Sequence, residues 1–211
     1  MSTTQTHIPL QGLVAILRGI RPEECIATTR ALYEEGFRLI EIPLNSPEPL
    51  KSIEMVRKHL PEDCVIGAGT VLTPQAVGQV KEAGGELIVM PHSDPAVISR
   101  AKQLGMLCAP GVATPTEAFA ALAAGADALK LFPAEQLGPQ VLKAWRAVLP
   151  RELCLLPVGG VTPDNMDIYI KAGAGGFGLG SALYKPGQSA EDTRSNARRF
   201  QQNWKLLTQA A

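Results

Sequence analysis

Two charged residues, Lys130 and Glu41, each interrupt a short apolar run. Lys130 lies in the segment Ala-Leu-Lys-Leu-Phe, and Glu41 lies in Leu-Ile-Glu-Ile-Pro-Leu. Because side chains alternate between the two faces of a strand, Lys130 points away from the face shared by Leu129 and Leu131. A charge is costly against an apolar helix layer, so both side chains are expected on the inner face. A structural ion pair is the alternative, but two opposite charges in one interior favour a functional site.

A buried lysine beside a carboxylate predicts imine chemistry. A lysine attacks a ketone only as the free amine. Burial, and the cationic Arg18 at the end of the first predicted strand, would lower the pKa of Lys130 from about 10.4. Glu41 can then move protons during imine formation and carbon–carbon cleavage. We therefore expect Lys130 to be a nucleophile and Glu41 a general acid/base.

Glycine pairs follow the last two predicted strands. Gly159-Gly160 comes before Val-Thr-Pro, and Gly180-Ser181 ends the final strand. Such glycines can simply allow tight turns. Exposed backbone amides in both loops at once are more typical of a phosphate site.

These residues are placed by a pattern of strands that alternate with helices along the whole chain. Proline near helix starts and glycine after helix ends mark the boundaries. We predict strands at Leu13–Arg18, Leu39–Leu44, Val65–Val71, Leu87–Pro91, Met106–Pro110, Ala128–Phe132, Cys154–Val158 and Gly176–Gly180. We predict helices at Glu23–Glu35, Pro47–His59, Pro74–Ala83, Pro95–Leu104, Thr116–Ala124, Pro139–Val148, Pro163–Lys171 and Ala190–Thr208.

Eight such units in 211 residues predict one α/β domain, a single (β/α)8 TIM barrel over residues 1–211. An open doubly wound sheet is disfavoured, because no Gly-x-Gly-x-x-Gly follows the first strand. We expect the first dozen residues to form a short lead-in that closes the barrel floor. In such a barrel the strand ends meet at one mouth, which would bring Lys130, Glu41, Arg18 and both glycine loops together.

Composition argues against several classes of partner. Basic and acidic residues number 20 each, without a long basic run, so nucleic acid and anionic membranes are not expected as partners. Apolar stretches are too short to cross a membrane, and the first residues lack the features of a signal peptide. The four cysteines form no Cys-x-x-Cys pair. We expect a cytoplasmic protein with reduced thiols.

The motifs together resemble those of the 2-keto-3-deoxy-6-phosphogluconate (KDPG) aldolase family, over nearly the whole chain. The motifs that carry the resemblance are Val14–Gly19, Glu41–Ser46, Ile66–Val71, Lys130–Pro133, Val158–Val161 and Gly178–Ser181. The resemblance implies a class I, Schiff-base aldolase that needs neither a metal nor another cofactor, and it implies a homotrimer.

The resemblance also implies roles for individual residues. Lys130 would form the Schiff base and Glu41 would be the general acid/base. Thr70 and Pro91 would surround the pyruvyl moiety, and Phe132 would pack beside the imine. Gly159, Gly160 and Ser181 would bind the phosphate.

One position departs from the gluconate-type members, which carry Arg four residues after the catalytic Glu. That position is Asn45 in this chain. We expect Arg18 to bind the substrate carboxylate or nearby hydroxyls instead. Arg18 with Asn45-Ser46 resembles the galactonate branch, whose members cleave 2-dehydro-3-deoxy-6-phospho-D-galactonate to pyruvate and D-glyceraldehyde 3-phosphate.

Three alternatives stay open at this stage. The chain could prefer the C4 epimer, KDPG, or accept both epimers. It could be a phosphosugar-binding barrel without lyase activity, with Lys130 as an ion partner of Glu41. A metal-dependent aldolase is disfavoured, because His92 is the only one of three histidines near the predicted site.

Overall fold

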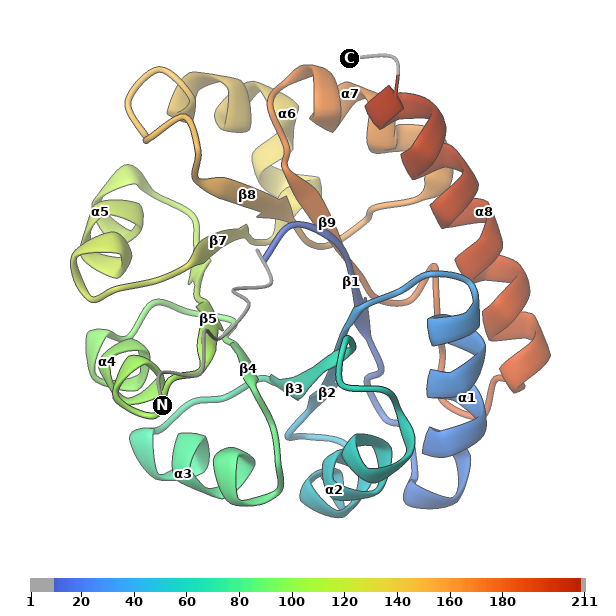
Figure 1. The fold of residues 1–211 in the computed structure, drawn as a ribbon. Coiled ribbons are helices and arrows are strands. Elements are labelled where there is room, and N and C mark those ends of the chain that lie inside the picture. The colour runs from blue at the N-terminus through green and yellow to red at the C-terminus, as the bar shows by residue number, and fades with distance from the viewer. Residues whose placement is uncertain (1–9, 210–211) are drawn as a thin grey trace, which may run out of the picture.

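The computed structural model describes residues 10–209 and consists of parallel strands surrounded by helices. Figure 1 shows the strands at the centre and the helices on the outside. The strands are β1 (Gly12–Ile16), β2 (Leu39–Pro43), β3 (Val65–Gly69), β4 (Leu87–Val89), β5 (Leu107–Ala109), β6 (Gly111–Val112), β7 (Ala128–Leu131), β8 (Cys154–Pro157) and β9 (Gly176–Leu179). The helices are α1 (Pro22–Glu34), α2 (Pro49–His59), α3 (Pro74–Glu82), α4 (Pro95–Gln103), α5 (Pro115–Ala123), α6 (Ala134–Trp145), the 3-10 helix η1 (Pro163–Asn165), α7 (Met166–Lys171) and α8 (Ala190–Gln209).

The strands form two parallel sheets in a regular register. One sheet has the order β5-β4-β3-β2-β1-β9, and the other has the order β6-β7-β8. A single parallel bridge between Val158 and Gly178 links the region after β8 to β9. Between the sheets, the amide of Asp127 donates to the carbonyl of Cys108 and the amide of Lys130 donates to that of Pro110.

The predicted strand Met106–Pro110 is wrong in its extent, because the structure divides this region into β5 and β6. Pro110 lies between the two pieces and has no N–H to donate to a ladder. The strand direction continues as β6, which pairs with β7 through Gly111 and Val112. The described part of the chain therefore contains nine strands, whereas eight were predicted.

Helix boundaries differ from the predictions by more than one residue in three of the predicted helices. Helix α6 begins at Ala134 instead of Pro139, and its two pieces meet at Gly138, where φ is 73°. Helix α2 begins at Pro49 instead of Pro47, because Glu48 before it has a left-handed φ of 40°. The predicted helix Pro163–Lys171 is a 3-10 turn followed by α7.

Alternation along the strands separates two apolar cores. The larger core fills the space between strands and helices and includes Leu13, Ala15, Ile40 and Ile42. The smaller lies inside the strands and consists of Leu10, Val14, Leu39, Val65, Leu87, Val89, Ala109, Ala128 and Leu156. Leu10 is the part of the predicted lead-in that joins this inner core, whereas residues 1–9 of the lead-in lie outside the described residues.

The inner core predicts where the charged residues point. Leu39 and Glu41 are two positions apart on β2, and Ala128 and Lys130 are two positions apart on β7. Because Leu39 and Ala128 belong to the inner core, Glu41 and Lys130 face the same interior. The predicted inward orientation of both charges is therefore confirmed.

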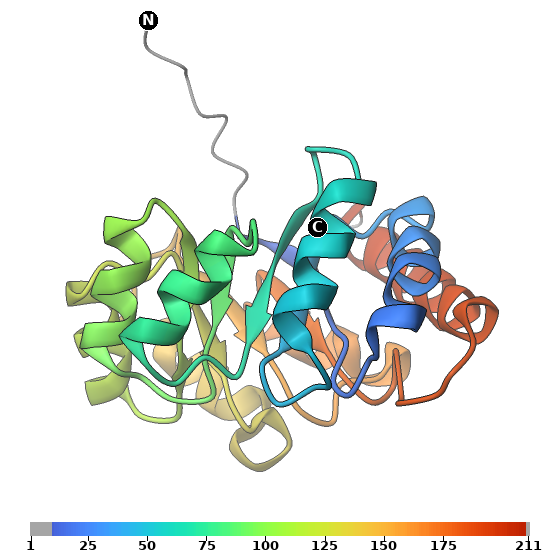
Figure 2. The same ribbon diagram turned by 90° about the horizontal axis from the view of Figure 1, so that it is seen from below.

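The last helix packs beside the first one. Figures 1 and 2 both show α8 (red) and α1 (blue) side by side at one edge of the molecule. Within residues 10–209, no helix combines the length and apolar character required to cross a membrane.

Candidate functional site

Glu41 is a carboxylate enclosed by three neighbouring strands. It lies on β2, in register with Ile16 of β1 and Gly67 of β3, and is 2% exposed. A Cβ placed on Gly69 would lie 2.0 Å from Oε2 of Glu41. The carboxylate therefore needs glycine at position 69. Oε2 of Glu41 has no hydrogen-bond partner in the described part of the chain.

Lys130 reaches the same interior from the opposite sheet. It is 6% exposed and lies on β7 between Gly111 of β6 and Leu156 of β8. Its Nζ lies 4.4 Å from the centroid of the Phe132 ring. Lys130 and Glu41 both line a cavity of about 10 Å³ between the inner core and the strand ends. No ion pair within 4.0 Å joins them among the salt bridges of residues 10–209.

Burial opposes both charges of this pair. Burial raises the pKa of Glu41 to about 7, although the nearby cations Lys130 and Arg18 favour its ionised form. Burial likewise lowers the pKa of Lys130, Glu41 acts in the opposite sense, and the positive charge of Arg18 lowers it further. The predicted shift of the Lys130 pKa is confirmed in direction. Burial therefore shifts Lys130 toward its free amine, beside a carboxyl group that gains and loses a proton near pH 7.

Arg18 joins the ends of the first three strands. It donates from Nη1 to Oδ1 of Asn45 at 2.6 Å, and from Nη1 and Nη2 to Oγ1 of Thr70 at 3.4 Å each. Thr70 has a left-handed φ of 54°, which turns the chain directly after β3. The amide of Gly19 donates to Oγ of Ser46 at 2.9 Å. The guanidinium is thus held at the strand ends.

A pocket of about 360 Å³ opens above Lys130, and we call it the mouth pocket. Of the predicted site residues, it is lined by Arg18, Lys130, Phe132, Gly159, Gly160, Gly180 and Ser181. Gly159 and Gly160 have φ values of 107° and 67°. Residues other than glycine rarely adopt such positive φ values. The structure therefore brings the lysine, the arginine and both glycine loops to one pocket, as the sequence predicts.

Four predicted site residues do not line the mouth pocket. Glu41 lies deeper, in the small cavity that also contacts Lys130. Asn45 and Thr70 contact Arg18 instead. Pro91 is half-buried after β4 and lines neither cavity, but it lies so close to Gly111 that a Cβ there would be 2.7 Å from its carbonyl.

Sequence reasoning missed two charged residues beside the glycine loops. Lys185 lines the mouth pocket in the loop after β9, where its position in a polar loop predicts only a solvated side chain. Glu135, at the start of α6, lies against Gly160, whose added Cβ would be 2.8 Å from Oε2 of Glu135. The available signal for Lys185 was its place four residues after Ser181, within the loop that was already assigned to the site.

Candidate metal ligands do not cluster in the part of the chain that the structure describes. No three or more His, Cys, Asp and Glu side chains there are close enough to hold one ion. His92 is half-buried in the loop after β4, and its Nδ1 has no partner among the described residues. The four cysteines are free, and Cys25, Cys64 and Cys108 are buried.

Comparisons with known proteins agree with this geometry. The sequence model of the KDPG and KHG aldolase family matches residues 5–196. A probable 2-dehydro-3-deoxy-6-phosphogalactonate aldolase of Rhizobium meliloti is 55% identical over 195 residues, which cover 90% of this chain and 92% of that protein. The 2-dehydro-3-deoxy-6-phosphogalactonate aldolase of Escherichia coli is 49% identical over 93% of this chain and 94% of its own length. A solved structure described as native KDPGal is similar with a TM-score of 0.93 and 47% identity, covering 97% of this chain and 98% of the other.

Proposed function

Because the chain belongs to the KDPG and KHG aldolase family, we propose that it is a class I aldolase acting on 2-dehydro-3-deoxy-6-phospho-D-galactonate. The products are pyruvate and D-glyceraldehyde 3-phosphate. The observation that carries the proposal is Lys130, an amine buried below the mouth pocket without an ion pair to Glu41 among the described residues. A lysine whose role was structural would use its charge, whereas this environment favours the free amine.

The reaction begins at the C2 carbonyl of the substrate. Nζ of Lys130 adds to C2 to give a carbinolamine, which loses water to form a protonated imine. Glu41 gives the proton that allows the hydroxyl to leave as water. Its carboxylate then takes the proton of the C4 hydroxyl while the C3–C4 bond breaks. The electron pair moves into the imine, glyceraldehyde 3-phosphate departs, and an enamine remains on Lys130.

The second half of the reaction reverses these proton transfers. Glu41 returns a proton to C3 of the enamine and restores the imine. Water then adds to the imine and releases pyruvate from Lys130. A carboxyl group with a pKa of about 7 suits this exchange, because it is readily protonated and deprotonated at neutral pH.

The rest of the mouth pocket would hold the two charged ends of the substrate. Arg18, oriented by Asn45 and Thr70, binds the carboxylate or the hydroxyls near it. The backbone amides of Gly159, Gly160 and Gly180 and the hydroxyl of Ser181 bind the phosphate. Phe132 packs beside the imine, which is supported by its contact with Nζ of Lys130. Thr70 and Pro91 complete the pyruvyl site.

The larger architecture is part of the same proposal. We propose that residues 1–211 form one closed (β/α)8 barrel domain, in which β5 and β6 together make one strand. The bridge between Val158 and Gly178 and the hydrogen bonds between β7 and the β5–β6 region support closure at both gaps between the sheets. The protein is proposed to act in the cytoplasm as a homotrimer, with no metal or cofactor. The buried free thiols fit a reducing compartment.

Trapping with borohydride tests the reaction class. Borohydride added with pyruvate reduces the imine, so a stable adduct is expected on the peptide that contains Lys130. Lys130→Met should give no adduct, whereas Lys205→Met, which changes an exposed lysine on α8, should react like the wild type. Absence of an adduct on the wild-type protein would show a binding barrel without lyase chemistry.

Substrate preference is tested by kinetics on the two C4 epimers. The relatives named for the galactonate substrate and the presence of Asn45 support a higher kcat/KM for the galactonate epimer. A site with a placed polar group can discriminate a hydroxyl strongly, because the wrong epimer leaves that group without a partner. Near-equal kcat/KM values would instead support an enzyme that accepts both epimers.

A further inference from the structure

Lys185 occupies a position in the mouth pocket that nothing in the proposed chemistry yet uses. It follows Leu183 and Tyr184, which are 0% and 3% exposed and anchor the loop after β9. The amides of Leu183 and Tyr184 both donate to the carbonyl of Gly180, which folds this loop against the strand end. Lys185 itself is exposed and lines the pocket together with Ser181.

The next residue fixes the loop on its other side. Pro186 packs so closely on Gly19 that a Cβ at Gly19 would be 2.7 Å from its Cγ. The backbone of Lys185 is therefore held between a buried anchor and the turn that follows Arg18. Its side chain forms no ion pair among those found for residues 10–209.

Neither Arg18 nor Lys130 provides a positive charge for the phosphate of the substrate. The basic side chains that line the mouth pocket are Arg18, Lys130 and Lys185. Arg18 is held beside the strand ends with Asn45, and Lys130 must be a neutral amine in order to react. On the phosphate side, the carboxylate of Glu135 lies against Gly160 and adds negative charge. A cationic side chain there would add a charge-assisted hydrogen bond to the contacts that the backbone amides make with the phosphate.

We propose that Lys185 binds the phosphate of the substrate and makes the enzyme selective for phosphorylated over unphosphorylated 2-keto-3-deoxy sugar acids. This inference rests on the proposed function and assigns its phosphate specificity to one side chain. Lys185 offsets the charge of Glu135 and contacts the phosphate from the loop after β9, at the end of the substrate that does not react. The expected effect is on binding of the intact phosphorylated substrate.

The test compares Lys185→Met on the phosphorylated substrate and on its analogue that lacks the phosphate. We expect KM for the phosphorylated substrate to rise about 10- to 100-fold, as for loss of a charged hydrogen bond, with kcat changed by less than about twofold. Kinetics on the unphosphorylated analogue should be unchanged. Lys185→Arg should restore most of the affinity, and Lys205→Met serves as the matched control for loss of one exposed positive charge.

Two results would overturn the assignment. An equal loss on both substrates would show that Lys185 supports the loop and does not recognise phosphate. An unchanged KM would show that the backbone amides and Ser181 suffice. Borohydride trapping with pyruvate separates either result from a failure of the proposed function, because pyruvate has no phosphate and should still label Lys130 in Lys185→Met.

Discussion

At the level of single residues, Glu41 and Lys130 face one apolar interior, and burial acts against the charge of each. The raised pKa of Glu41 and the lowered pKa of Lys130 are consequences of that enclosure. The inner core surrounds them with aliphatic side chains such as Val14 and Leu156. A site that buries two ionisable groups among aliphatic side chains is more reactive, but it lowers the stability of the fold.

The pH dependence of stability should show this effect. Burial raises the folded-state pKa of Glu41 from 4.5 to about 7, so its folded form holds a proton that the unfolded chain releases between these values. The contribution of Glu41 to stability is therefore fully present below about pH 4.5 and is lost as the pH rises to about 7. The shift corresponds to roughly 3 kcal/mol.

Glu41→Gln removes this titration, so it tests whether burial of Glu41 lowers the stability as the pH rises. Relative to wild type, its free energy of unfolding should rise progressively between about pH 4.5 and 7, by roughly 3 kcal/mol in total. Its kcat should fall about 100- to 10,000-fold. Urea unfolding across this pH range measures the first effect. Glu54→Gln, at an exposed position on α2, provides a control without that rise; a flat difference for Glu41→Gln would contradict the buried titration.

Sequence predicts the reactive residues better than their surroundings. A charge in an apolar strand is visible in the sequence, so Lys130 and Glu41 could be identified from alternation alone. Lys185 was not identified, because a lysine in a loop has the same local pattern whether it faces a pocket or solvent. The position of Glu135 against Gly160 likewise depends on a contact between the first turn of α6 and the loop after β8.

At the level of elements, β3 determines where the carboxylate of Glu41 can lie. Gly67 and Gly69 have no side chain, and β2 and β3 pair in register across Glu41. A Cβ on Gly69 would lie 2.0 to 2.4 Å from the three carboxyl atoms of Glu41. The strand thus holds space for one side chain of its neighbour.

Gly69→Ala should displace the carboxylate and reduce activity strongly. We expect kcat of the folded variant to fall by at least about 100-fold, which is comparable to the loss of the acid/base group. Steady-state kinetics and circular dichroism together measure activity and folding. Gly78→Ala is the matched control: Gly78 lies within α3, nothing lies within 4 Å of an added Cβ, and the change should stabilise by about 0.5–1 kcal/mol. Full activity of Gly69→Ala would exclude a fixed position for Glu41.

Element boundaries show where local sequence is insufficient. The predicted helix starts at Pro74 and Pro95 are confirmed. The helices begin there because the side chains of Thr73 and Asp94 cap their first turns. The start of α6 is missed, because the left-handed Gly138 before Pro139 resembles a helix start although a helical turn already precedes it. The division of β5 from β6 has two causes: Pro110 has no N–H for the ladder, and the two pieces pair with different neighbours, β4 and β7. Only the proline is visible in the local sequence.

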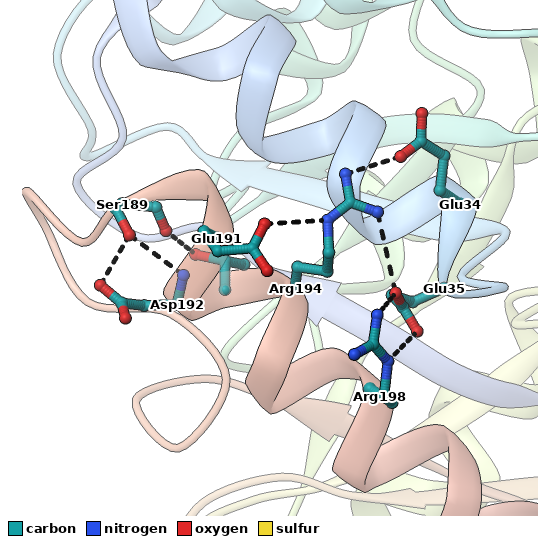
Figure 3. A network of polar contacts seen from close by, with 8 residues as sticks. Glu34, Glu35, Ser189, Glu191, Asp192, Arg194 and Arg198 are labelled. Atoms are coloured by element: carbon teal, nitrogen blue, oxygen red, sulfur yellow. Dashed lines mark hydrogen bonds and ion pairs between the residues drawn. The ribbon is translucent and has the colours of Figure 1, made fainter.

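At the level of the whole molecule, the last helix is fastened to the first by a network of charges. Figure 3 shows Arg194 and Arg198 of α8 beside Glu34, the last residue of α1, and Glu35, which follows it. Arg194 contacts Glu34 at 2.6 Å, and Arg198 contacts Glu35 at 2.7 Å and 3.2 Å with two nitrogens. Acidic residues at the C-terminal end of a helix oppose its dipole, and α1 has no basic residue in its last turn. Arg194 and Arg198 of α8 therefore supply the positive charge that the C-terminal end of α1 lacks.

This network joins the two ends of the fold. Helix α1 follows β1, α8 follows β9, and β1 and β9 are paired neighbours. The chain connects β1 to β9 only through all the intervening elements, so contacts between α1 and α8 hold its first and last units side by side. The mouth pocket lies at the ends of these same strands and depends on their arrangement.

Replacing both arginines should loosen this junction without altering the chemistry. For Arg194→Met combined with Arg198→Met, we expect a lower free energy of unfolding, because Glu34 and Glu35 lose their cationic partners at the C-terminal end of α1. The loss should shrink in 1 M salt, because salt weakens ion pairs between solvent-exposed side chains. Lys58→Met, which breaks an exposed pair within α2, should cost less stability than the double substitution. A loss of equal size at both salt concentrations would show that the arginine stems stabilise the junction by packing instead of charge.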